Sequence, residues 1–277
     1  MAVSLRTFLL LNAAITSVFG FCGGRTHLDK RESEDIVPVA TFGYVGSGSP
    51  ILWHHLSPAN AICANGSNQS PINMVEGSFT LVPGSNLTVT LPDTLSEGAT
   101  FENLGSTIEV VMEGLGGTLE LEGLEYELLQ FHFHHPMEMH MVFQHETQLA
   151  VIGVYIDLVD SLSFNSTRLL PRRASSTMLE TIFSSIEGIA SPGTSTKTPA
   201  FSMTELSDLL ATADFQRYSG SLTTPPCSEG VTWSVSTKKL MLSRQTFAKV
   251  RDVIGFNSRY LQNTPGLANL LVMAQLT

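Results

Sequence analysis

The stretch LLQFHFHHPMEMHMVFQH, residues 128–145, holds five of the eight histidines in this chain of 277 residues. His132 and His134 stand two residues apart, and His140 follows shortly after Pro136. Side chains two apart on a strand point to the same face of a sheet. Apolar residues alternate with the histidine pair on both sides, so the opposite face is expected to be core. The pattern indicates a strand with one face that carries imidazoles.

Three of these histidines can share one metal ion. If the chain turns back after Pro136 and pairs antiparallel with itself, we expect residue 134 to face residue 140, with residues 135–139 as the turn. Directly opposed residues point the same way, so His132, His134 and His140 would lie on one face. Three neutral nitrogens with an open fourth position are typical of catalytic zinc and not of structural zinc.

Two polar side chains on the same stretch are placed to orient these ligands. A ligand histidine usually donates its second ring N–H to a carboxylate or an amide, which fixes its tautomer. Glu138 precedes His140 by two residues, and Gln130 precedes His132 by two residues, so each shares a face with its histidine. The alternative is a row of polar surface histidines, which is the usual fate of a lone His-x-His. The apolar alternation favours the metal site.

The remainder of the chain has the pattern of a sheet built from short strands. Alternation with period two runs through residues 87–91, 107–112 and 118–122, with glycine-containing turns between them. Residues 149–156 are continuously apolar and predict a buried central strand. The other predicted elements are helices at residues 177–187 and 244–253, a surface loop at 191–199, and a strand or packed tail at 267–274. The fold class is therefore mainly β (α+β), with a few short peripheral helices around one domain over residues 41–277.

The N-terminal segment has the layout of a targeting sequence. Residues 1–20 combine a positive charge, a short apolar run and small residues at a cleavage position, which is typical of a secretory signal peptide. The apolar run is shorter than the roughly 20 residues that a membrane-spanning helix needs. Residues 21–40 are polar and predict a short pro-segment or a disordered N-terminus, in which Lys30 and Arg31 predict a dibasic processing site.

Composition limits the partners of the protein. The formal net charge is −10 and only 14% of the residues are charged. An acidic chain has no electrostatic attraction to nucleic acid or to an anionic membrane, so we expect neither as a partner. Four Asn-x-Ser/Thr sequons agree with a secreted, extracellular glycoprotein. They begin at Asn65, Asn68, Asn86 and Asn165.

The chain contains three cysteines. Cys22 lies beside the predicted cleavage region, which leaves Cys63 and Cys227. In an oxidising compartment such a pair is typical of one disulfide. It would close a loop of about 160 residues and stabilise the fold by roughly 4–5 kcal/mol in the chain-entropy model. Two buried free thiols are the alternative.

From about residue 41 to residue 266 the chain resembles the α-class carbonic anhydrases. The resemblance implies a large, mostly antiparallel, twisted central sheet with a metal at the bottom of a conical cleft. Cys63 and Cys227 match the disulfide of secreted members. Gln-Ser-Pro-Ile-Asn and Ser-Leu-Thr-Thr-Pro-Pro are together highly specific. The matching stretches are FGY at 42–44, WH at 53–54, CANGSNQSPIN at 63–73, QFHFH at 130–134, EMH at 138–140 and YSGSLTTPPCSEGVTW at 218–233.

This resemblance implies a zinc enzyme that reversibly hydrates carbon dioxide to bicarbonate and a proton. Zinc would be held by His132, His134 and His140, and a zinc-bound hydroxide would attack the substrate. Thr223 matches the residue that accepts a hydrogen bond from the hydroxide and orients it, and Thr224 lies beside it in the substrate pocket. An apolar wall would receive carbon dioxide, which carries no charge. Its residues match Val142, Val151, Leu222 and Trp233.

The chain departs from the family directly after Pro136, where a segment of the family is missing. That segment carries the glutamate that accepts the proton of the threonine matched by Thr223. A second register would give this role to Glu138 and leave His145 as the third ligand. The match of the two following strands with the family favours His140 instead.

Two functions of different kinds follow from this departure. The first is a carbonic anhydrase, a lyase, whose activity is weakened by the missing glutamate. The alternative is a non-catalytic, carbonic-anhydrase-like secreted binding module. The three retained histidines favour the enzyme, whereas the lost glutamate favours the module. A truncated gene prediction would also explain the short segment.

Overall fold

The computed structural model describes residues 37–75, 77, 79–159 and 174–274. The predicted signal peptide, the dibasic pair and the sequon at Asn165 lie outside the described residues. The strands are β1 (Leu81–Pro83), β2 (Thr88–Thr90), β3 (Thr100–Asn103), β4 (Ile108–Val111), β5 (Thr118–Leu121), β6 (Leu124–His134), β7 (Glu138–His145), β8 (Gln148–Leu158), β9 (Ser195–Lys197), β10 (Asp214–Ser221), β11 (Glu229–Ser236) and β12 (Leu240–Leu242). The α-helices are α1 (Trp53–Leu56), α2 (Ile62–Asn65), α3 (Thr177–Phe183), α4 (Thr204–Thr212), α5 (Arg244–Ile254) and α6 (Leu270–Ala274).

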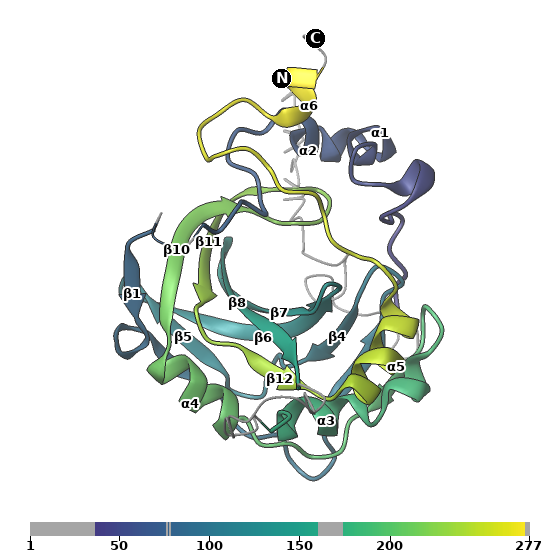
Figure 1. Ribbon diagram of the computed structural model, residues 1–277, viewed down its shortest axis with the longest axis vertical. Helices are drawn as coiled ribbons and strands as arrows, with labels where there is room; N and C mark the ends of the chain where they lie inside the picture. Colours follow the sequence, from purple (N-terminus) through teal and green to yellow (C-terminus); the bar gives the residue numbers. More distant parts are fainter. Residues whose placement is uncertain (1–36, 76, 78, 160–173, 275–277) are drawn as a thin grey trace, which may run out of the picture.

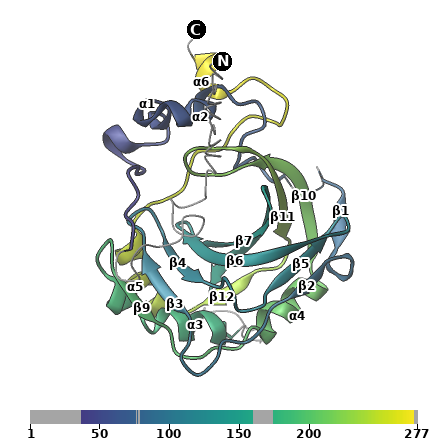
Figure 2. The same cartoon turned by 180° about the vertical axis from the view of Figure 1, so that it is seen from behind.

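One twisted sheet of 12 strands organises the described residues (Figures 1 and 2). Its main path runs β1-β10-β11-β8-β7-β6-β4-β3-β9, and β2, β5 and β12 attach beside it. Most neighbours are antiparallel, but β8 pairs in parallel with both β11 and β12. The prediction of a large, mostly antiparallel sheet with few short helices is confirmed. The strand β8 lies inside this path, between β11 and β7, as the apolar run at residues 149–156 predicted.

The two faces of the sheet have different partners. Alternate residues of β6 and β7, among them Phe131, Phe133 and Met139, are fully buried in the main hydrophobic core. Helices α3 and α4 pack apolar side chains such as Leu179 and Leu206 into this core. Figure 1 shows α3, α4 and α5 along one side of the curved sheet, with α1, α2 and α6 at the opposite end of the molecule. The histidines therefore face away from the main core.

Local sequence signals explain where the two predicted helices begin. Ser176 accepts a hydrogen bond from the Leu179 N–H at the start of α3, and Ser243 accepts one from the Thr246 N–H at the start of α5. Such serine caps satisfy backbone donors that have no partner inside the helix. The helix α5 ends at Gly255, whose φ of 63° is a conformation that glycine adopts without strain.

Two expectations from the sequence need correction, and the structure decides a third between its alternatives. The predicted loop at residues 191–199 contains β9, which pairs with β3 and forms the end of the main sheet path. The C-terminal tail forms the short helix α6 near α2, which agrees with the predicted packed tail and not with the strand that was its alternative. The predicted helix at residues 177–187 stops at Phe183, and a 3₁₀ turn follows at Ile186–Ile189. Both β9 and α6 contact segments that are distant in the sequence, β3 and α2, and a local pattern does not contain these contacts.

The register of the histidine hairpin also differs from the prediction. His132, and not His134, lies opposite His140, and His134 lies opposite Glu138. The turn is therefore shorter than expected and contains residues 135–137 only. A shift of two residues keeps every side chain on its predicted face, whereas a shift of one would reverse them all.

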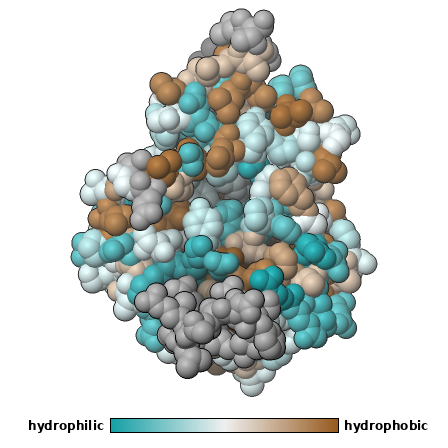
Figure 3. Space-filling view, viewed as in Figure 1, coloured by the Kyte–Doolittle hydropathy of each residue, from teal (hydrophilic) through white to brown (hydrophobic). Residues whose placement is uncertain are grey.

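The disulfide lies at the end of the molecule that carries α1 and α2. Cys63 and Cys227 are bonded, and both are fully buried against Trp53. Figure 3 shows that apolar side chains are frequent around this end of the visible surface. Exposed examples from the nearby helices are Leu56 and Met273. In the described part of the chain, every helix is too short or too polar to cross a membrane.

Candidate metal centre

Two neighbouring rows of the sheet place the candidate site residues on one face. In the first row His132 of β6 lies opposite His140 of β7. In the second row Gln130 lies opposite Val142, which lies opposite Val151 of β8. Gln130 and Val142 each stand two positions from a residue of the first row, and Val151 lies opposite Val142, so both rows face the same way. Three consecutive strands thus contribute to one surface.

The ring nitrogens of His132 and His134 are oriented by acceptors outside the cluster. Nδ1 of His132 lies 2.9 Å from Oε1 of Gln130, and Nδ1 of His134 lies 2.8 Å from the backbone oxygen of Asn257. An oxygen acceptor requires each Nδ1 to carry the proton, which leaves a lone pair on each Nε2. The two Nε2 atoms face each other at 3.1 Å. Two facing lone pairs repel each other, and a cation bound between them would remove this repulsion.

His140 supplies the third nitrogen with the opposite ring orientation. Its Nε2 lies 3.5 Å from Oε1 of Glu138. Its Nδ1 is buried and has no hydrogen-bond partner among the described residues. One ligand atom from each of His132, His134 and His140 lies within 4.8 Å of the other two. The three imidazoles can therefore hold a metal ion together.

Burial keeps His132 and His134 neutral. Burial, and then the neighbouring His140, lower the pKa of His134 to about 4. Burial, followed by His134 and His140, holds the pKa of His132 well below its usual value. Burial alone would raise the pKa of Glu138, but His140 and His134 outweigh it and lower that pKa. At neutral pH His132 and His134 therefore offer unprotonated nitrogens beside an ionised carboxylate, which is the state that binds a metal.

The donor set fits zinc. Imidazole nitrogens are common zinc ligands, and two ligands of a tetrahedral zinc at about 2.0–2.1 Å stand roughly 3.3 Å apart. The separation of 3.1 Å between the two Nε2 atoms is close to this value. Each ring is also held through its second nitrogen, as metal-binding histidines commonly are. Three protein ligands leave a further position open, which is typical of catalytic zinc sites.

The apolar residues predicted for the substrate wall form one cluster beside the histidines. Val142, Val151, Leu222 and Trp233 are all buried and belong to a small hydrophobic cluster separate from the main core. Trp233 packs edge-on against His140, with ring centroids 4.9 Å apart. The structure thus brings the predicted wall residues together, although they come from β7, β8, β11 and the loop after β10.

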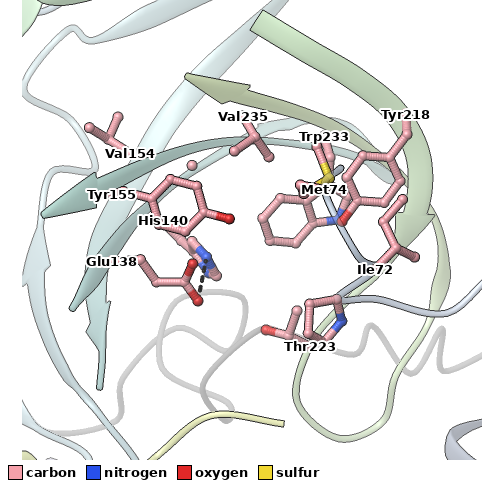
Figure 4. A pocket seen from close by; sticks show the side chains of 12 residues that line it. Ile72, Met74, Glu138, His140, Val154, Tyr155, Tyr218, Thr223, Trp233 and Val235 are labelled. Carbon is pink, nitrogen blue, oxygen red and sulfur yellow. Dashed lines mark ion pairs between the residues drawn. The ribbon is translucent and has the colours of Figure 1, made fainter. Parts of the chain in front are cut away.

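Thr223 and Thr224 lie in that loop, and both are buried. Thr223 borders a small cavity beside the cluster, together with Glu138, His140 and Trp233 (Figure 4). Its Oγ1 has no hydrogen-bond partner among the described residues. A buried hydroxyl without a partner is costly, so this atom marks a position where a bound group or a water belongs.

The candidate residues from the sequence converge, with two qualifications. His145, the alternative third ligand, lies outside the cluster, and its Nδ1 is 2.7 Å from the backbone oxygen of Glu125. Asn257 was not predicted, although its backbone oxygen orients His134 and its side-chain amide donates to the backbone oxygen of Phe133 at 3.0 Å. Asn257 is 123 residues from His134, and no local pattern links the two.

The fold and the histidine cluster together define a protein with three histidines that could hold a metal ion on a large twisted sheet. The family model of eukaryotic-type carbonic anhydrase matches residues 49–265. The chain therefore belongs to the carbonic anhydrase family.

Relatives and solved structures agree with this membership. A carbonic anhydrase of a Nostoc species is 30% identical over 233 residues, which cover 80% of this chain and 82% of the relative. The fungal α-carbonic anhydrase from Aspergillus oryzae matches with a TM-score of 0.76 and 35% identity, over 85% of this chain and 99% of that chain. An α-carbonic anhydrase from Thermovibrio ammonificans, solved with the inhibitor sulfanilamide, matches with a TM-score of 0.66 and 33% identity, over 81% of this chain and 96% of that chain.

Proposed function

We propose that this protein is a secreted zinc enzyme that reversibly hydrates carbon dioxide to bicarbonate and a proton. The observation that carries the proposal is the convergence of three buried imidazoles, each held through its second nitrogen. The named activity of the relatives supports it. The buried disulfide between Cys63 and Cys227 supports an oxidising compartment and hence secretion.

The residues around the cluster have distinct roles in this proposal. His132, His134 and His140 would hold zinc. Zinc is a Lewis acid that makes water nucleophilic near neutral pH, for which carbonic anhydrases are the standard example. Gln130 and Glu138 orient two of the ligand rings.

The buried wall and the two threonines support the proposed position of the substrate. The cluster of Val142, Val151, Leu222 and Trp233 offers an apolar surface to carbon dioxide, which has no charge to solvate. Thr223 would align the attacking oxygen through its hydroxyl. Thr224 would border the substrate beside it.

A non-catalytic binding module is the second candidate. The observation in its favour is the Thr223 hydroxyl, which lacks a hydrogen-bond partner among the described residues. Without an acceptor for its proton, this hydroxyl can rotate and misalign the attacking oxygen. A protein of this kind would bind zinc and leave carbon dioxide unchanged.

Stopped-flow hydration of carbon dioxide, with zinc content measured on the same secreted sample, separates the two candidates. The enzyme proposal expects one zinc per chain and hydration above the buffer rate. It also expects that His140→Ala removes both zinc and activity, whereas His145→Ala, which changes a histidine outside the cluster, retains both. Stoichiometric zinc without hydration would establish the binding module, and absence of zinc from the folded protein would overturn both candidates.

A further inference from the structure

A small cavity beside the histidine cluster is bordered by polar groups from three separate segments. Its volume is about 40 Å³, and one water molecule requires roughly 10–15 Å³. Glu138 lies at the start of β7, Tyr155 lies on β8, and Thr223 lies in the loop after β10. Figure 4 shows the carboxylate of Glu138 and the hydroxyls of Tyr155 and Thr223 facing the same open space. The cavity therefore has both the room and the polar partners that an ordered water needs.

Among the polar groups that line this cavity, the Thr223 hydroxyl most needs a hydrogen-bond partner. Its oxygen is buried, and the described residues provide it with no hydrogen bond. A hydroxyl has one proton to donate and two lone pairs to accept. If its proton is committed to an acceptor in the cavity, its lone pairs remain available toward the histidine cluster. The direction of this single O–H bond thus decides whether Thr223 can align a substrate.

Glu138 supplies acceptor capacity in the same cavity. Its Oε1 is paired with Nε2 of His140 at 3.5 Å. A carboxylate has about four lone-pair sites on its two oxygens, so the contact with His140 leaves sites for water. Direct contact between Glu138 and Thr223 is not among the hydrogen bonds of the described residues. A bridging water is the connection that the cavity allows.

Tyr155 is the phenol whose hydroxyl is available to hold this water. It lies directly opposite Glu138 in the β7–β8 pair, so both side chains point the same way. The other phenol of the cavity, Tyr218, already lies 3.2 Å from the Ser70 hydroxyl and stacks on Trp233. Burial, and then the nearby Glu138, raise the pKa of Tyr155, so its hydroxyl keeps its proton at neutral pH.

We propose that Tyr155 is a positioning residue that acts, with Glu138 and an ordered water in this cavity, on the Thr223 hydroxyl. The water accepts hydrogen bonds from the Tyr155 and Thr223 hydroxyls and donates one to the Glu138 carboxylate. The proton of Thr223 then points into the cavity, and its lone pairs point toward the cluster. This arrangement would replace the glutamate that the chain lacks, and the inference rests on the proposed hydration function.

The first test is a crystal structure of the full secreted chain at a resolution that shows ordered water. We expect a water within hydrogen-bond distance of Tyr155 Oη, Thr223 Oγ1 and a Glu138 oxygen. In Tyr155→Phe we expect this water to be lost or displaced, with the backbone unchanged. An empty cavity, or a water that does not touch Tyr155, would overturn the proposal. This measurement needs neither metal nor activity, so it is independent of the proposed function.

The second test is the kinetics of Tyr155→Phe. We expect kcat for carbon dioxide hydration to fall roughly 10- to 100-fold, because alignment of the attacking group is lost. KM, zinc content and the thermal midpoint should stay unchanged. The matched control is Tyr126→Phe, which removes a phenol hydroxyl bonded to Gln148 at 2.8 Å, outside the cavity. The control should keep the wild-type kcat.

The outcomes separate this inference from the proposed function. Wild-type kcat in Tyr155→Phe would overturn the positioning role and leave the hydration function standing. A wild-type chain that binds zinc without hydrating carbon dioxide would overturn the function, and the crystal structures would still decide whether Tyr155 holds the water. A loss of zinc in Tyr155→Phe would show a structural role and also contradict the proposal.

Discussion

At the scale of single residues, the site is determined by the second nitrogen of each histidine. The two nitrogens of an imidazole have opposite roles in the neutral ring, so fixing one fixes the other. Gln130 and Asn257 fix the Nδ1 protons of His132 and His134. Glu138 contacts Nε2 of His140 instead, and this ring therefore presents Nδ1 to the cluster. The different ring orientations follow from where each acceptor lies.

The first prediction concerns Gln130. We expect Gln130→Ala to weaken zinc affinity by roughly 10- to 100-fold, because the Nδ1 proton of His132 loses its acceptor and the ring loses its fixed tautomer. Competition with a chelator of known affinity measures this change. Gln144→Ala is the control, because the hydrogen bond of that amide in the structure goes to the backbone oxygen of Glu146. Equal affinity of the two variants would contradict the role given to Gln130.

The second prediction concerns the hydroxyl of Thr223. Thr223→Val keeps the shape of the side chain and removes only its hydrogen-bonding atom. We expect kcat/KM for hydration to fall by about 100-fold or more, since a group that aligns the reacting atom is lost, while zinc content stays at one per chain. Stopped-flow kinetics with metal analysis measures both. Unchanged kinetics would show that the hydroxyl has no part in the reaction.

At the scale of elements, the β6–β7 hairpin shows what the sequence can predict and what it cannot. Period-two alternation was sufficient to place His132, His134 and His140 on one face. It could not decide whether His132 or His134 lies opposite His140, because both registers keep the histidines on that face. His132 lies opposite His140 because the turn contains only residues 135–137. The alternation of apolar and polar residues does not determine the length of a turn. The strand β9 was missed because its three residues pair only with the distant β3.

The third prediction concerns the contact between α3 and α5. Glu180 of α3 accepts hydrogen bonds from the backbone N–H of Ser243, at 2.9 Å, and from the Thr246 hydroxyl, at the start of α5. Its negative charge also lies where a helix N-terminus favours one. We expect Glu180→Ala to lower the free energy of unfolding by about 1–2 kcal/mol in denaturant titrations at neutral pH. Glu187→Gln, which changes an exposed partner of Lys249, should have no measurable effect.

This contact also predicts a pH dependence. Burial alone would raise the pKa of Glu180, but its hydrogen bonds with Thr246 and Ser243 outweigh burial and lower that pKa below 4.5. A carboxyl with a lowered pKa in the folded state stabilises the fold above its unfolded-state pKa. This contribution is lost as pH falls through the folded-state pKa. The difference between wild type and Glu180→Gln should therefore be largest at neutral pH and shrink in acid. A difference that grows on acidification would contradict the assignment.

At the scale of the whole molecule, the site exists only because distant segments meet. The wall combines residues of β7, β8 and β11 with the loop after β10, and Asn257 comes from the chain beyond α5. The resemblance to a known family predicted the wall and the threonines, because it carries the long-range contacts that a local pattern lacks. Neither spacing nor the quoted motifs contain the contact of Asn257 with His134 or the cavity that Tyr155 borders, so only the structure could reveal them.

The last prediction concerns the disulfide, which joins residues 164 positions apart. Cys63 in α2 is bonded to Cys227, whose N–H donates to the backbone oxygen of Thr224 at 2.8 Å. The guanidinium of Arg259 donates to the backbone oxygen of Cys63 at 2.9 Å and lies over the ring of Trp53. The disulfide and these hydrogen bonds therefore connect the loop that carries Thr223 and Thr224 to α2 and to the chain around Arg259. Removal of the disulfide should loosen that end of the molecule and leave the β6–β7 hairpin in place.

We expect the double variant Cys63→Ala/Cys227→Ala to lose about 3–5 kcal/mol of unfolding free energy in guanidinium titrations. Alanine avoids burying the two unpaired hydroxyls that serine would introduce. A reductant should lower the wild-type midpoint toward that of the variant and leave the variant itself unchanged. Zinc should still bind one per chain below the unfolding transition, because the ligand histidines are held by the hairpin and by Asn257. A variant as stable as the wild type would mean that the unfolded chain gains little freedom when this loop is opened.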